Sequence, residues 1–133
     1  MIKGKAIVPS HLDTPLQLTL VVGDSVCVWV ELKSGGRFEI ASDQDQRYLL
    51  RFEQVGSVTK VVQVDTRFAE RKVGKKQRSV AFDVLMEPVD AAQRFRYKGP
   101  VGRIDFHRSN GRMEVEKDYA RDTQAVVVIE EMP

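Results

Sequence analysis

The residues that could bind a metal are few and far apart in this sequence. His11 and His107 are the only histidines, and neither begins an H-x-x-E or H-E-x-x-H pattern. A zinc site usually needs three or four protein ligands, and Cys27, the only cysteine, cannot supply a cysteine cluster. The sequence therefore predicts no metal centre and implies no cofactor.

A calcium loop is the other metal site to consider. Asp43 and Asp45 lie close together in the stretch SDQDQ, and Glu39 is nearby. Calcium takes six to eight oxygen ligands, whereas this stretch has the composition of an ordinary polar turn. The turn is the favoured interpretation.

No side chain is placed for nucleophilic catalysis. The sequence has no G-x-S-x-G motif, and Cys27 alternates with Val26 and Val28, which is typical of a small buried side chain. Lys60 falls in phase with valines that should face inward, and we expect its amine to extend outward at a sheet edge rather than act as a base. Because no base, nucleophile and oxyanion donor can be combined, we expect the protein not to be an enzyme.

The strongest charge feature is the segment 67–78, RFAERKVGKKQR. It has six basic residues and one acid, whereas the rest of the chain sums to −3. One interpretation is a surface for phosphate, polyanionic glycan or nucleic acid, and the other is a solvated loop. The loop is favoured, because Phe68 is the only aromatic residue here and readers of single-stranded nucleic acid add stacking aromatics to a basic groove. The candidate binding residues are Arg67, Arg71, Lys72, Lys75, Lys76 and Arg78.

Trp29 is the remaining candidate binding residue. In the alternating stretch SVCVWVEL it falls on the face opposite Val28 and Val30. It could cap a small second core beneath the C-terminal part of the chain, or it could lie exposed and stack on a sugar ring. The first interpretation is favoured, because residues 91–133 need a surface to pack on.

Alternation of apolar and polar residues predicts the elements that carry these side chains. The chain has 133 residues, of which 42% are hydrophobic, so it can bury a core as one domain, 1–133. Period-two stretches recur about every ten residues through residues 1–90, which predicts an all-β, antiparallel, immunoglobulin-like β-sandwich core of about seven strands. In residues 91–133 we expect a C-terminal extension on or beside this core, with one hairpin and then a short helix or a last strand.

Several short motifs taken together resemble a known family. The stretches IKGKAIV, SGGRFEI, YLLRF and GSVTKVVQVDT are similar to the carboxypeptidase regulatory-like domain, which is also called the transthyretin-like β-sandwich. The matching positions are Gly4, Ala6, Gly36, Phe38, Ile40, Tyr48, Leu50 and the stretch 56–66.

The chain also resembles a variant of this family that is common in envelope proteins of Bacteroidetes-type bacteria. Its T-K-x-x-x-x-D-T pattern and its tail are matched by Thr59, Lys60, Asp65, Thr66, Ile104, Phe106, Asp118 and Tyr119. The chain departs from the family at residues 33–35, where an acid or amide is usual, and at Ser57, where an aromatic is usual. These departures concern the geometry of two turns.

The resemblance implies an accessory domain, because the zinc chemistry of metallocarboxypeptidases lies in a separate catalytic domain. We therefore expect a non-enzymatic binding or structural module of the bacterial cell envelope, which recognises a protein or glycan partner through an edge strand or surface loops. One alternative is a carbohydrate-binding module of the starch-binding-like type. The other is a cytoplasmic nucleic-acid binder that uses segment 67–78, and nucleic acid is the less favoured partner.

Two features bear on location. The longest apolar run, AVVVI, is too short to span a membrane. The opening MIKGKAIVPS lacks the apolar stretch and cleavage site of a signal peptide. The expected location is the periplasm or cell surface if a leader has been removed, with the cytoplasm as the alternative.

Overall fold

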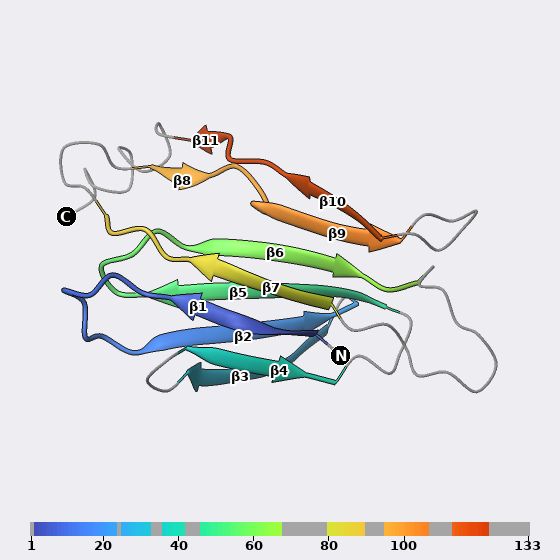
Figure 1. Ribbon diagram of the computed structural model, residues 1–133, viewed down its shortest axis with the longest axis horizontal. Coiled ribbons are helices and arrows are strands. Elements are labelled where there is room, and N and C mark those ends of the chain that lie inside the picture. Colours follow the sequence, from blue (N-terminus) through green and yellow to red (C-terminus); the bar gives the residue numbers. More distant parts are fainter. Residues whose placement is uncertain are drawn as a thin grey trace.

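The computed structural model describes residues 2–23, 25–32, 36–41, 46–67, 80–89, 95–106 and 113–122, without the side chains of residues 26–29 and 122. This part of the chain is all-β and has no helix (Figure 1). Its strands are β1 (Ile2–Ile7), β2 (Leu16–Val22), β3 (Ser25–Leu32), β4 (Arg37–Ile40), β5 (Arg47–Gln54), β6 (Lys60–Asp65), β7 (Val80–Leu85), β8 (Arg96–Tyr97), β9 (Gly102–Phe106), β10 (Met113–Lys117) and β11 (Arg121–Asp122). The predicted all-β sandwich is confirmed, and the first seven strands fall within residues 1–90.

Two sheets of unequal width make the sandwich. The larger sheet has six strands in the order β10-β9-β6-β5-β2-β3, and the smaller has three in the order β4-β1-β7. A separate pair, β11-β8, lies beside the end of the larger sheet (Figure 1).

Most neighbouring strands are antiparallel, as predicted, but two pairs are parallel. β7 pairs with β1, and β9 pairs with β6, in parallel registers. The purely antiparallel prediction was wrong at these two places. The reason is that the chain leaves the larger sheet after β6 and the smaller sheet after β7. β7 therefore joins the edge at β1, and β9 joins the edge at β6, without a hairpin turn that would make the pair antiparallel.

The core lies between the sheets and is built around three phenylalanines. The ring of Phe38 on β4 packs against Phe52 on β5 and Phe82 on β7, with centroids 5.3 and 5.5 Å away. Leu50, Phe52 and Val64 on the larger sheet and Ile2 and Val80 on the smaller are almost fully buried. Burying a side chain of this size stabilises a fold by about 1.5–3 kcal/mol, so the contact between the sheets fixes their relative position.

Two glycines allow the smaller sheet to form. Gly36 has a φ of 60°, which favours glycine, and its carbonyl accepts a hydrogen bond from the N–H of Ala6 at 2.8 Å. At Gly4 on β1, a Cβ atom would lie 1.6 Å from the carbonyl oxygen of Phe82. The close approach of β1 to β7 therefore requires glycine at this position.

Among the described strands, the unequal width leaves part of the larger sheet with no strand facing it. β9 and β10 extend that sheet beyond β6, and Figure 1 shows them to one side of β7, which is the last strand of the smaller sheet. Residues 102–106 and 113–117 thus extend the larger sheet through strand pairing. The candidate site lies where the smaller sheet ends at β7 and the larger sheet continues through β9 and β10.

Candidate functional site

An apolar groove runs beside β7, above β6, β9 and β10. Its volume is about 380 Å³. We call it the β7 groove, and its lining residues are Lys60, Val62, Phe82, Asp83, Val84, Leu85, Glu87, Val101, Gly102, Ile104, Val115, Lys117 and Tyr119. The floor is buried valine and isoleucine, whereas Leu85, Val115 and Tyr119 at the rim are more than half exposed. Exposed apolar side chains around a concave surface are typical of a binding site.

The open edge of β7 forms one wall of the groove. The N–H of Met86 donates to the carbonyl of Ile7 at 2.8 Å, so the backbone groups of Met86 face β1. Because successive residues of a strand direct these groups to alternate sides, those of Ala81, Asp83 and Leu85 face the groove. Within the described residues β7 has no strand on this side, and an unpaired edge of this kind can accept an added strand.

Lys60 closes one end of the open edge. Its ammonium donates to the carbonyl of Leu85 and lies 2.9 Å from the carboxylate of Glu87. The expectation that this amine extends outward was wrong, since the side chain is only 6% exposed. The reason is that Glu87 and the Leu85 carbonyl supply partners for the charge inside the sandwich, so the amine need not reach solvent.

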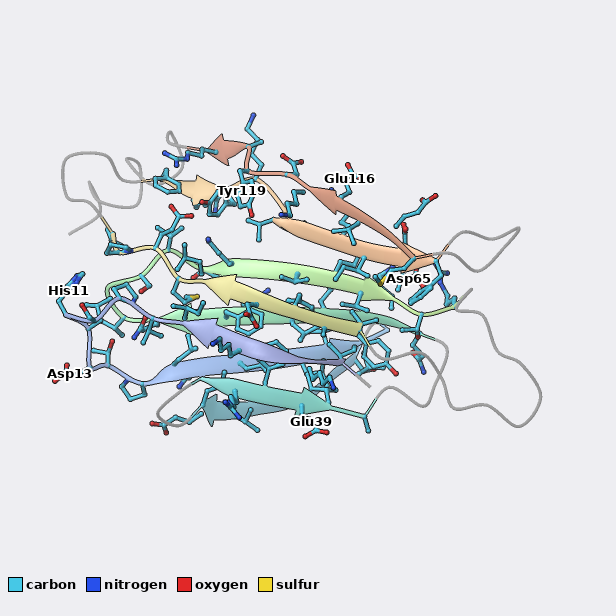
Figure 2. The ribbon with its side chains drawn as sticks, viewed as in Figure 1. His11, Asp13, Glu39, Asp65, Glu116 and Tyr119 are labelled. Carbon is cyan, nitrogen blue, oxygen red and sulfur yellow. The ribbon has the colours of Figure 1, made fainter. Side chains whose placement is uncertain are left out.

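Two tyrosines complete the end wall around Lys60. The rings of Tyr97 and Tyr119 each have their centroid 5.8 Å from the ammonium, within range of a cation–π contact. The hydroxyl of Tyr97 donates to the carboxylate of Glu87. Figure 2 shows Tyr119 beyond the end of β10, near β8. We call Lys60, Glu87, Tyr97 and Tyr119 the Lys60 cluster.

The ionisation of the Lys60 cluster follows from its contacts. Burial raises the pKa of Glu87, but hydrogen bonds from Tyr97 and Lys60 outweigh it, and the pKa lies below the usual value. Burial and the hydrogen bond to Glu87 raise the pKa of Tyr97 to about 12. At neutral pH the cluster therefore holds a carboxylate, paired with Lys60, and a neutral tyrosine. These contacts link Lys60 on β6 to Glu87 after β7 and to Tyr97 on β8.

Arg67 is the one predicted binding residue whose side chain the structure describes. Its guanidinium donates to both carboxylate oxygens of Asp65, to Oδ1 at 3.0 Å and to Oδ2 at 2.7 Å. Figure 2 shows Asp65 at the end of β6 opposite the Lys60 cluster. Arg67 is therefore bound within the chain and lies away from the β7 groove. The candidates Arg71, Lys72, Lys75, Lys76 and Arg78 lie outside the described residues, as does the side chain of Trp29.

The other residues considered for chemistry are scattered. Figure 2 shows His11 and Asp13 in the connection after β1, whereas Glu39 lies on β4. Among the described residues no group of three or more histidine, cysteine or acidic side chains could hold a metal ion. His107, Asp43 and Asp45 lie outside those residues. Among the residues that the structure describes, no helix is long and apolar enough to cross a membrane.

Sequence reasoning did not find the β7 groove. The groove depends on which strands end up at the sheet edges, and this is set by the two parallel pairs. One signal was present, because Met113, Val115 and Lys117 alternate with Glu114 and Glu116 in the stretch MEVEK. This pattern predicts a strand with one apolar face, and the structure leaves Val115 more than half exposed on that face.

Comparison of the chain with known protein families, with curated proteins and with solved structures found no match. The resemblance to the carboxypeptidase regulatory-like domain therefore remains a prediction from the residues that carry it.

Proposed function

We propose that the chain is a non-enzymatic binding module that takes up an extended segment of a protein partner in the β7 groove. The observation that carries this proposal is the open edge of β7 above an apolar floor. In strand addition, the backbone groups of an open edge give affinity, and pockets for alternate side chains give specificity. The backbone groups of Ala81 and Asp83 face the groove and meet the first requirement. The buried valines of the groove floor offer the apolar surface for the second.

The shape of the groove limits what can bind. Strands in a sheet lie about 4.8 Å apart, so β9 and β10 extend the larger sheet about 10 Å beyond β6. A second folded copy pairing through β7 would bring its own larger sheet into the space that β9 and β10 occupy. One added strand avoids this overlap. A slender extended segment is therefore the favoured occupant.

The cell envelope remains the proposed setting, on the strength of the family resemblance alone. The two alternative functions have less support. Carbohydrate binding depends on Trp29, whose side chain lies outside the described residues. Nucleic-acid binding depends on segment 67–78, and its first residue, Arg67, already pairs with Asp65.

A selection experiment tests the proposal. A displayed library of random peptides is selected against the full chain, and the affinity of the selected peptides is measured by fluorescence anisotropy. We expect peptides with apolar residues at alternate positions. Two variants then test the edge. Asp83→Pro removes an N–H that faces the groove and spares the backbone bonds to β1, whereas Asp83→Ala keeps that N–H. Both variants lose the hydrogen bond from the Lys5 N–H to the Asp83 carboxylate, so the comparison isolates the N–H of residue 83.

We expect Asp83→Pro to bind the peptides on the order of tenfold more weakly than Asp83→Ala. Val115→Arg should weaken binding as well, because it places a charge at the apolar rim. Equal affinity for the Pro and Ala variants, with both folded by circular dichroism, would overturn strand addition. Failure to select any peptide would overturn the proposal as a whole.

A further inference from the structure

The smaller sheet has a second open edge, at β4. Among the described strands, β4 has β1 on one side and no strand on the other. The N–H of Ala6 on β1 donates to the carbonyl of Gly36, so the backbone groups of Gly36 face β1. Because these groups alternate along a strand, those of Phe38 also face β1, whereas those of Arg37 and Glu39 face away from it. The backbone on the open side therefore belongs to one base and one acid.

The side chains of Arg37 and Glu39 are exposed on the outer face of this sheet. Neither forms an ion pair with a described residue. The neighbour of Arg37 on β1 is Lys5, and like charges directly opposite each other are destabilising. Figure 2 shows Glu39 directed away from the other strands, beyond the free edge of β4. An acid beside Arg37 on the open side would offset the charge of Lys5.

A second copy of the chain supplies that acid in one register. When β4 pairs with β4 of a second copy about a two-fold axis normal to the sheet, the two strands are antiparallel. With Phe38 opposite Phe38, Arg37 of each copy lies opposite Glu39 of the other, whereas a register centred on Arg37 or on Glu39 places like charges opposite each other. In the favoured register Arg37 and Glu39 form hydrogen-bonded pairs, which exchange both N–H···O bonds.

The arrangement of the two sheets permits this approach at β4. Figure 1 shows β4 lying across β3, the last strand of the larger sheet, so the two sheets end at about the same place. At β7, by contrast, β9 and β10 extend the larger sheet beyond the smaller one. A second copy at β4 therefore meets no such overhanging pair of strands, and it leaves the β7 groove of each copy open.

We infer that the chain forms a symmetric dimer in which the two β4 strands pair and Arg37 binds Glu39 of the second copy. The smaller sheets then form one continuous sheet in the order β7-β1-β4-β4-β1-β7. The paired strands are short, so we expect a weak dimer with a dissociation constant of about 10–100 µM. The inference does not depend on the proposed function, because it uses the opposite edge of the smaller sheet.

Charge exchange tests the pairing of the two β4 strands. Sedimentation velocity of the full chain from about 10 µM to about 1 mM should show a monomer–dimer equilibrium. Arg37→Glu and Glu39→Arg should each be monomeric over this range, because each places like charges opposite each other. An equimolar mixture of the two variants should dimerise, because every opposed pair then joins an acid and a base. For the same reason, a chain that carries both substitutions should dimerise.

Arg51→Glu is the matched control, since it makes the same change in net charge as Arg37→Glu at an exposed position on β5 of the larger sheet. It should dimerise as the unsubstituted chain does, and circular dichroism checks that every variant is folded. The inference is overturned if the unsubstituted chain is monomeric throughout the range, or if the folded single variants still dimerise. It is also overturned if both the mixture and the double variant stay monomeric. Failure to select a peptide, with the dimer present, would overturn the proposed function alone.

Discussion

The ammonium of Lys60 and the carboxylate of Glu87 lie 2.9 Å apart and join the two sheets of the sandwich. Lys60 begins β6 in the larger sheet, and Glu87 follows β7 in the smaller one. The same ammonium also donates to the carbonyl of Leu85, so the ion pair marks where the open edge of β7 ends. Its removal should affect both stability and the groove.

Substitution of Lys60 tests the contribution of this ion pair to stability. Lys60→Met keeps most of the side-chain volume but leaves the Leu85 carbonyl and Glu87 without their charged donor. We expect the free energy of unfolding to fall by about 1–3 kcal/mol, the usual cost of leaving a buried polar group unsatisfied. Chemical denaturation measures it, and Glu87→Gln and the double variant complete a double-mutant cycle. Additive effects of the two substitutions would contradict direct coupling.

The hydroxyl of Tyr97 should make stability fall at alkaline pH. Its pKa is raised from 10.0 to about 12 by burial and by the hydrogen bond to Glu87. A group with a raised pKa in the folded state contributes stability that is complete below its unfolded pKa and is lost as the pH rises. Stability should therefore decline between pH 10 and about 12. Denaturant midpoints across this range should decline less in Tyr97→Phe, and an equal decline in both proteins would exclude Tyr97 as the cause.

Gly4 should be among the least replaceable residues of the smaller sheet. In Gly4→Ala the new Cβ would lie 1.6 Å from the Phe82 carbonyl oxygen, so β1 and β7 must separate. We expect a loss of about 3 kcal/mol, at the upper end for overpacking. Gly99→Ala is the control, because the nearest atom to its Cβ is the Arg103 guanidinium at 3.7 Å. Thermal denaturation should show a change within about 0.5 kcal/mol for the control, and similar losses for both would refute the close approach of β1 and β7.

The sequence predicted the faces of single strands well. Alternation assigned Leu16 and Leu18 to one face of β2, and Tyr48, Leu50 and Phe52 to one face of β5, and all five side chains are buried. This worked because each strand of a sandwich has one face against the core, so the pattern is local. Alternation within β6 also assigned Lys60 to the same inward face as Val62 and Val64, and all three are buried.

The groove could not be predicted because it depends on contacts between distant parts of the chain. The partners of Lys60 follow β7, and alternation within β6 carries no information about them. The number of strands in each sheet is set by the parallel pairing of β1 with β7 and of β6 with β9. These pairings depend on tertiary packing, which local patterns do not encode. Trp29 and segment 67–78 beyond Arg67 remain candidates from sequence alone.

The pair of Asp65 and Arg67 should make stability fall at acid pH. Burial raises the pKa of Asp65, but hydrogen bonds from Arg67 outweigh it, and the pKa lies below the ordinary value of 3.8. A lowered pKa in the folded state contributes stability that is present above the unfolded pKa and is lost as the pH falls through the folded one. The free energy of unfolding should therefore decrease below about pH 4.

Two variants test whether this acid dependence comes from the pair. Asp65→Asn removes the titrating carboxyl, and Arg67→Met removes the donors that lower its pKa, so each should flatten the decrease. Urea denaturation at a series of acid pH values gives the slopes. A double variant that matches either single one would place both residues in a single interaction. If Arg67→Met keeps the slope of the unsubstituted protein, Arg67 is not the cause of the lowered pKa of Asp65.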